Sequence, residues 1–168
     1  MHTLRRVGIC AATLTVVISP AGTFGIIRAA AEGGTTVSLD ADLRRCDFSL
    51  VTGERPITRP ALGSGSALIH RAGSTAIAEV HLSDAPDPGT HYDVGLIQEP
   101  RPSSATCGPG DPGTAFTGMD TDAAGTGTVT IQDTVRQGTT GVWVVIERGD
   151  PHSQTPAEAY TSEFVAPV

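Results

Sequence analysis

Histidines are the residues of this chain whose spacing could support metal chemistry. Two of them, His70 and His81, flank a predicted β-hairpin, and His91 begins the next predicted strand. We expect His70 and His81 at the ends of this hairpin away from its turn, where they could approach each other. Glu79 shares a strand face with His81, because side chains alternate along a strand. Three imidazoles and a carboxylate could bind Cu or Zn, as in a metal-binding or oxidoreductase-like sandwich.

The wider context of these histidines does not match a metal motif. The chain contains neither H-x-H nor H-E-x-x-H. Similarity to copper–zinc dismutase sandwiches is therefore architectural only. Isolated histidines at strand ends are the simpler interpretation, so we expect no cofactor. A metal site at His70, His81 and His91 remains the alternative.

The aspartates suggest a second kind of candidate site, a calcium-binding loop. The pattern Asp120-x-Asp122-x-x-Gly125 resembles a fragment of a calcium loop, but Ala124 and Ile131 stand where further ligands are needed. We therefore predict that these aspartates cap a tight turn between two strands.

Motifs for nucleophilic catalysis and phosphate binding are absent from the sequence. There is no G-x-S-x-G elbow, and the GSGS run at residues 63–66 has its serines at the wrong offsets. No dinucleotide or phosphate-cradling motif occurs. We predict that the protein is not an enzyme. A hydrolase whose residues meet only in the fold is a third, weaker alternative.

The first 31 residues have the features of an export signal. Arg5 and Arg6 precede an uncharged, mostly apolar stretch at residues 7–27, and small residues at 29–31 offer a cleavage site. We predict removal of residues 1–31 and a single domain at 32–168, secreted to the extracellular space or cell envelope with no membrane span. Cleavage after Ala21, or retention of the leader as an anchor, are the alternatives.

Two cysteines remain in the mature chain, Cys46 and Cys107. A lone pair in an exported protein is most simply a disulfide. The chain-entropy model gives at most about 4 kcal/mol of stabilisation for a loop of this length.

Charge and composition limit the partners. The formal net charge is −7, there is no Lys, and all 11 basic side chains are Arg, so nucleic acid is excluded as a partner. Four arginines, at 44, 45, 55 and 59, form a local basic stretch that could meet a lipid headgroup or polysaccharide. Acids in the same stretch match them in number, which favours simple charge balance.

Short apolar runs separated by Gly, Pro and Asp predict an all-β domain. The predicted strands are Val37–Leu43, Asp47–Val51, Ser66–His70, Thr75–Leu82, Tyr92–Gln98, Phe116–Asp120, Gly127–Val135, Gly141–Glu147 and Tyr160–Val165. Their spacing favours a two-sheet β-sandwich of the immunoglobulin or fibronectin kind with one disulfide. The run at 142–146 is apolar on both faces, so it should be a covered central strand with Trp143 as the core anchor.

One local pattern is more specific to a fold. The stretch Pro88-Gly89-Thr90-His91-Tyr92-Asp93-Val94-Gly95-Leu96 resembles the entry to strand F of fibronectin type III domains. The resemblance implies that Tyr92 is a structural residue whose hydroxyl bonds back to the backbone and locks a corner between two sheets.

Longer stretches resemble uncharacterised secreted proteins of mycobacteria and related actinobacteria. They are CDFS at 46–49, HYDVGLIQEPRPSSATCGPGDPG at 91–113, TDAAGTGTVTI at 121–131 and GVWVVIERGDPHSQTPAEAYTSEFVAPV at 141–168. The resemblance implies export and a β fold and brings no assigned activity. The export signal, the short-strand pattern, the lone cysteine pair and the lack of a catalytic motif together favour a binding or surface-interaction module. We expect its ligand to be a protein, lipid or polysaccharide at the cell surface.

Overall fold

The computed structural model describes residues 33–52, 63–84 and 86–168. The described residues all belong to one compact unit, residues 31–168. The predicted leader, like Arg55 and Arg59, lies outside the described residues. Within the described part of the chain, no helix has the length and apolarity needed to cross a membrane.

The described residues form nine β-strands in one antiparallel sheet. The strands are β1 (Thr35–Asp40), β2 (Ser64–Ala72), β3 (Thr75–Ser83), β4 (His91–Glu99), β5 (Thr114–Asp120), β6 (Thr126–Thr134), β7 (Gly141–Arg148), β8 (Glu158–Ser162) and β9 (Ala166–Pro167). Their order in the sheet is β5-β4-β7-β8-β1-β2-β3-β6, with the short β9 beside β7.

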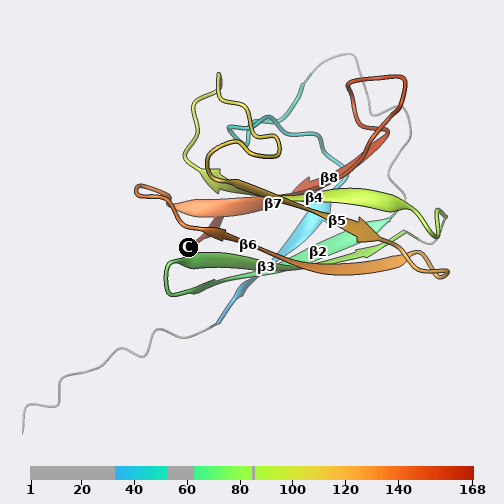
Figure 1. The fold of residues 1–168 in the computed structure, drawn as a ribbon, viewed down its shortest axis with the longest axis horizontal. Helices are drawn as coiled ribbons and strands as arrows, with labels where there is room; N and C mark the ends of the chain where they lie inside the picture. Colours follow the sequence, from blue (N-terminus) through green and yellow to red (C-terminus); the bar gives the residue numbers. More distant parts are fainter. Residues whose placement is uncertain (1–32, 53–62, 85) are drawn as a thin grey trace, which may run out of the picture. The chain divides into compact units, whose positions relative to one another are not determined.

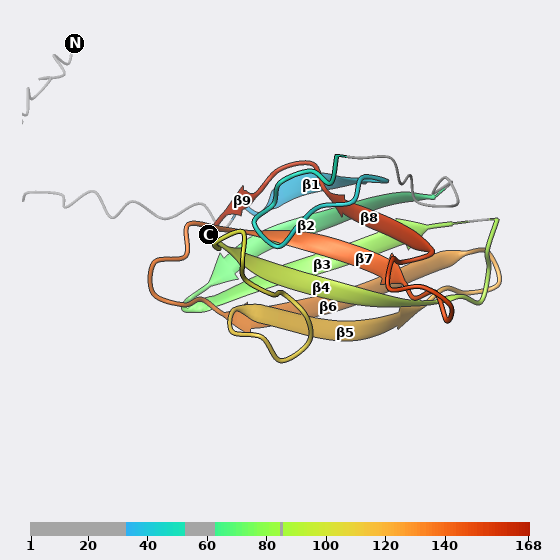
Figure 2. The same ribbon diagram turned by 90° about the horizontal axis from the view of Figure 1, so that it is seen from above.

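The sheet curls on itself into a nearly closed, barrel-like form. Strands β5 and β6 stand at the two ends of the sheet order, yet they lie next to each other. Figure 1 shows β4, β5, β7 and β8 on one side of the molecule and β2, β3 and β6 on the other, and Figure 2 shows the same strands from above. Alternate side chains of each strand therefore point into one shared interior.

The turn between β5 and β6 is the tight turn expected at Asp122–Gly127. The Oδ1 atom of Asp122 accepts the backbone N–H groups of Ala124 and Thr126 at 2.8 and 2.9 Å. These hydrogen bonds confirm the capping role predicted for Asp122. The turn links the two strands at the ends of the sheet order and so keeps them next to each other.

Eight of the nine predicted strands correspond to observed ones, with boundaries that shift by a few residues. The exception is Asp47–Val51, where only one isolated bridge forms, between Arg44 and Leu50. Here Phe48 adopts a left-handed backbone with φ of 63°, and the Asp47 carboxylate accepts the N–H of Ser49 at 3.2 Å. This local turn prevents an extended strand.

The main core fills the interior of the barrel. Strand β3 illustrates the pattern, because Ala76, Ala78, Val80 and Leu82 are buried while Glu79 and His81 face outward. The larger core side chains include Tyr92, Leu96, Ile69, Ile146 and Tyr160.

Strand β7 is covered on both faces, as its unbroken apolar run predicts. Residues 141–146 are all buried, and β7 lies between β4 and β8. Trp143 is buried, but it does not belong to the main core as we expected. It packs with Ile97 and Val145 in a second, smaller cluster on the opposite face of the sheet. Alternation explains this, because Val142, Val144 and Ile146 take the inward positions.

Two loop segments cover this second cluster, and the predicted disulfide joins them. Cys46 and Cys107 are bonded, with a Cα–Cα distance of 5.5 Å. The Phe48 ring meets Trp143 edge-on at 5.6 Å between centroids. Figure 1 shows the two segments, residues 41–52 and 100–113, above the layer of β4 and β7. We call these two segments the disulfide-linked cover.

Candidate functional site

The histidines predicted as metal ligands do not come together. In the β2–β3 hairpin, His70 lies opposite Ile77 near the turn, whereas His81 lies opposite Ser66 towards the other end. Four residues of extended chain, about 13 Å, separate these two positions along β2. Our expectation that both lie away from the turn is therefore wrong for His70.

His91 lies on β4 and has its own acidic partners. Its Nδ1 atom is 2.6 Å from Oδ1 of Asp120, and its Nε2 atom is 3.9 Å from Oδ1 of Asp93. The hydrogen bond to Asp120 raises the pKa of His91 and so favours the protonated imidazole. A protonated imidazole is a poor metal ligand. Among the described residues, the geometry thus favours the simpler interpretation of separate surface histidines.

A buried group of tyrosines and carboxylates, which the sequence analysis did not identify, lies at the barrel end formed by the β3–β4 and β7–β8 connections. The Tyr92 hydroxyl donates to Oδ2 of Asp84 at 2.6 Å and approaches Oε2 of Glu158 at 3.2 Å. The Tyr160 hydroxyl donates to Oε1 of Glu158 and accepts the backbone N–H of Gly63 at 3.1 Å. We call Asp84, Tyr92, Glu158 and Tyr160 the tyrosine–carboxylate cluster; each is at most 2% exposed.

Arg148 connects this cluster to the surface. Its Nη2 atom is 3.4 Å from Oε2 of Glu158, and its Nη1 atom is 3.5 Å from Oδ2 of Asp87. Asp84, Asp87 and Glu158 each offer one oxygen within 4.8 Å of the others. Three carboxylates thus share one guanidinium and two phenol donors.

The tyrosines act in this cluster as neutral hydrogen-bond donors. Burial, followed by the neighbouring carboxylates, raises the pKa of Tyr92 and of Tyr160 far above the usual range. Both phenols therefore keep their protons at physiological pH. Their O–H groups supply the hydrogen bonds that buried carboxylates require.

Three close carboxylates are also the ligand type that Ca²⁺ and Mg²⁺ prefer. Here, however, Tyr92, Tyr160 and Arg148 already satisfy oxygens that a cation would need. The arrangement fits a structural tie that holds the β3–β4 connection to β4 and β8.

Tyr92 therefore differs in one respect from the expected corner residue. The resemblance to fibronectin type III domains implies a backbone acceptor, whereas the hydroxyl of Tyr92 meets the side chains of Asp84 and Glu158. The tyrosine hydroxyl that contacts backbone is that of Tyr160, on β8. The same-face spacing of Glu158 and Tyr160 was the signal in the sequence that could have indicated this pair.

The outward surface of β1, β2, β3 and β6, which we call the four-strand face, carries a second candidate site. Strand register aligns its side chains in rows across the four strands. The two central rows are Thr36–Leu68–Glu79–Thr130 and Ser38–Ser66–His81–Thr128. Each row places one ionisable side chain of β3 among hydroxyl groups.

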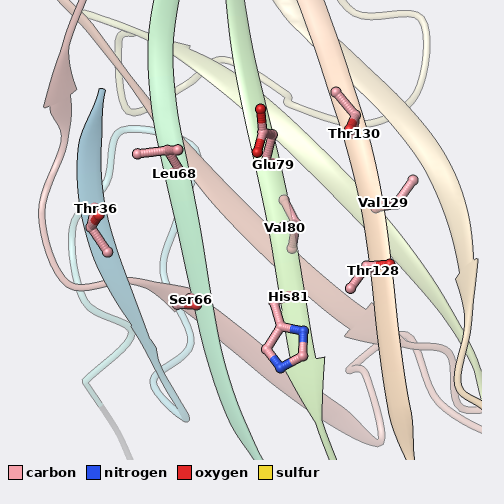
Figure 3. Close-up of a pocket in the computed structure, with 9 residues that line it drawn as sticks. All are labelled: Thr36, Ser66, Leu68, Glu79, Val80, His81, Thr128, Val129 and Thr130. Carbon is pink, nitrogen blue, oxygen red and sulfur yellow. The ribbon is translucent and has the colours of Figure 1, made fainter. Parts of the chain in front are cut away.

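A shallow, solvent-open hollow of about 470 Å³ lies over these rows. Figure 3 shows Glu79 and His81 one after the other on β3, with Thr128 and Thr130 on the β6 side and Leu68 on the β2 side. Both Glu79 and His81 are exposed, so their polar atoms are available to a ligand. The hollow combines one carboxylate, one imidazole, several hydroxyls and the aliphatic residues Leu68, Val80 and Val129.

Two arginines of the predicted basic stretch, Arg44 and Arg45, lie in the described residues, and both make local contacts. The guanidinium of Arg44 lies 4.1 Å from the centre of the Phe48 ring. Its Nη1 atom donates a hydrogen bond to the backbone carbonyl of Phe48 at 3.2 Å. Arg45 donates to the carbonyl of Leu50 at 3.3 Å. These two side chains stabilise the disulfide-linked cover.

Comparisons with protein-family models, curated proteins and solved structures find no match for this chain. The functional argument therefore rests on the geometry of its own residues.

Proposed function

We propose that this chain is an exported, disulfide-stabilised all-β protein that binds a polysaccharide at the cell surface and is not an enzyme. The observation that carries the proposal is the four-strand face, where Glu79 and His81 stand in a hollow lined by serine and threonine hydroxyls. The predicted leader and the disulfide support an oxidising location outside the cytoplasm.

The chemistry of this hollow suits a hydroxyl-rich ligand. A carboxylate such as that of Glu79 accepts hydrogen bonds from two neighbouring hydroxyls of a sugar ring. Threonine and serine hydroxyls can both donate and accept, so Thr128, Thr130 and Ser66 can adapt to either role. Leu68 offers an apolar contact for the C–H face of a ring.

Other ligand classes fit this face less well. Phosphate polymers and anionic lipid surfaces need a positive surface, but no Arg lies among the described residues that line the hollow. Stable protein interfaces are centred on large aromatic or Arg anchors, and the part of the lining that the structure describes contains neither. The alternative function, Cu or Zn binding by His70, His81 and His91, loses support because the strand register separates them.

A binding assay with matched charge variants tests this proposal. The full chain would be incubated with insoluble cell-wall polysaccharide, and with cellulose and chitin as neutral probes. Glu79→Gln removes the central carboxylate while keeping its shape, and Asp93→Asn removes one exposed carboxylate on β4 as the control. We expect retention of the wild type and the control, and at least a tenfold loss of affinity for Glu79→Gln.

Two results would overturn the proposal. One is a failure of the wild type to bind any of the polysaccharides. The other is an equal loss of affinity in Glu79→Gln and Asp93→Asn, because general charge would then explain the binding.

A further inference from the structure

A second hollow, of about 360 Å³, lies on the β4–β5 loop and is independent of the four-strand face. Three prolines, at positions 100, 102 and 112, and two arginines, Arg101 and Arg136, line it together with the small side chains of residues 104–106. No acidic residue is among the lining residues that the structure describes. This is unusual in a chain whose formal net charge is −7.

The two guanidinium groups meet at the peptide between Pro112 and Gly113. Both terminal nitrogens of Arg101 lie 2.9 Å from the carbonyl of Pro112. The Arg136 side chain lies against Gly113 so closely that a Cβ atom there would be 2.1 Å from its Nε atom. A glycine at position 113, with φ of +72°, is thus what allows Arg136 to reach this place.

Acids near this hollow already have other partners. Glu99 accepts the backbone N–H of Arg101 at 2.7 Å with one oxygen and the Trp143 indole N–H at 3.0 Å with the other. Asp133 accepts the side-chain amide of Gln98. In the described part of the chain, the guanidinium of Arg136 has neither an acidic partner nor a hydrogen bond.

The donors that remain are suited to an oxyanion. Arg136 keeps all the N–H groups of its planar fork, which can bind a phosphate or carboxylate through two parallel hydrogen bonds. The Nε atom of Arg101 is buried and has no acceptor among the described residues. Two like charges that converge without a counter-ion lose their mutual repulsion when an anion binds.

We propose that the hollow formed by Pro100, Pro112, Arg101 and Arg136 is a binding subsite for an oxyanion, a phosphate or carboxylate group carried by a ligand. Arg136 makes the direct contact, and Arg101, which is held at the carbonyl of Pro112, adds positive charge. The prolines restrict the backbone of the loop, so the loop loses little conformational entropy when a ligand binds.

Titration of the ¹⁵N-labelled full chain, followed by NMR of the arginine Nε–H groups, tests this subsite. The probes are inorganic phosphate, methyl phosphate, acetate and glucuronate at a constant chloride concentration. We expect saturable shifts of the Arg136 and Arg101 signals with at least one probe. Whether the phosphate or the carboxylate probes bind more tightly identifies the chemical class of the ligand group. Arg136→Gln should weaken this binding about tenfold or more.

Arg71→Gln is the matched control, because Arg71 is an exposed arginine on β2 whose side chain, within the described residues, hydrogen-bonds only to the carbonyl of Gly73. The proposal requires that this variant binds the probe as the wild type does. Shifts that never saturate, or an equal effect of Arg71→Gln and Arg136→Gln, would overturn it. The polysaccharide assay with Glu79→Gln is unaffected by either result, since the two sites share no residue.

Discussion

The Tyr92 hydroxyl donates a hydrogen bond of 2.6 Å to the Asp84 carboxylate, and both side chains are almost completely excluded from solvent. This bond ties the β3–β4 connection to the strand that follows it. A buried carboxylate needs such a donor, since an unpaired charge in the protein interior is strongly unfavourable. The tyrosine–carboxylate cluster therefore has a structural role that can be tested separately from binding.

Tyr92→Phe should destabilise the protein by about 1–3 kcal/mol, because it leaves Asp84 without its phenol donor. The free energy of unfolding from urea denaturation measures this effect. Thr128→Val, which removes an exposed hydroxyl on β6, is the control and should change stability by less than about 0.5 kcal/mol. Equal stability of Tyr92→Phe and the wild type would contradict a structural role for the hydroxyl.

Glu147→Gln should stabilise the protein at neutral pH. Burial raises the pKa of Glu147, and its cross-strand neighbour Asp93 raises it further. Because the folded-state pKa lies above the unfolded value, the native state favours the protonated acid, and stability falls as the pH rises from about 4.5 through the folded-state pKa. We expect a gain of about 0.2–1 kcal/mol at pH 7 and none below pH 4. A gain of the same size at both pH values would show that ionisation is not the cause.

Replacing both cysteines by serine should loosen the disulfide-linked cover before it affects the barrel. The cover packs on Trp143, whereas the main core of the barrel is a separate cluster. Trp143 is the only tryptophan, so a red-shifted emission would report its exposure while circular dichroism monitors the strands. The loss of stability should not exceed about 4 kcal/mol. An unchanged emission would show that packing alone holds the cover in place.

Calcium should leave the melting temperature unchanged. The oxygens of Asp84, Asp87 and Glu158 are close enough for a cation, but tyrosines and Arg148 supply their hydrogen bonds. A ligand at 100 times its Kd would stabilise the fold by about 2.7 kcal/mol, a rise of several degrees. A saturable rise with Ca²⁺ that disappears in Asp87→Asn would reveal a metal site and contradict the structural interpretation.

Local patterns in the sequence predict most strands and the disulfide. The apolar run around Trp143 identifies β7, and the Asp122 turn is correct in place and in mechanism. Apart from the hairpin of β2 and β3, sequence alone did not show which strands are neighbours. The cluster at Tyr92 includes Glu158, which is 66 residues away in the sequence. No local motif predicts a contact between residues so far apart. The misplacement of His70 has the same origin, because register along the hairpin decides which side chains meet.

Chemical-shift mapping of the four-strand face tests the central claim most directly. The labelled chain would be titrated with a soluble oligosaccharide made from whichever polysaccharide retains the protein. The proposed function predicts saturable changes centred on Glu79 and His81 and on the β2 and β6 residues beside them. Changes confined to other strands, or none at all, would contradict the assignment of this face as the binding surface.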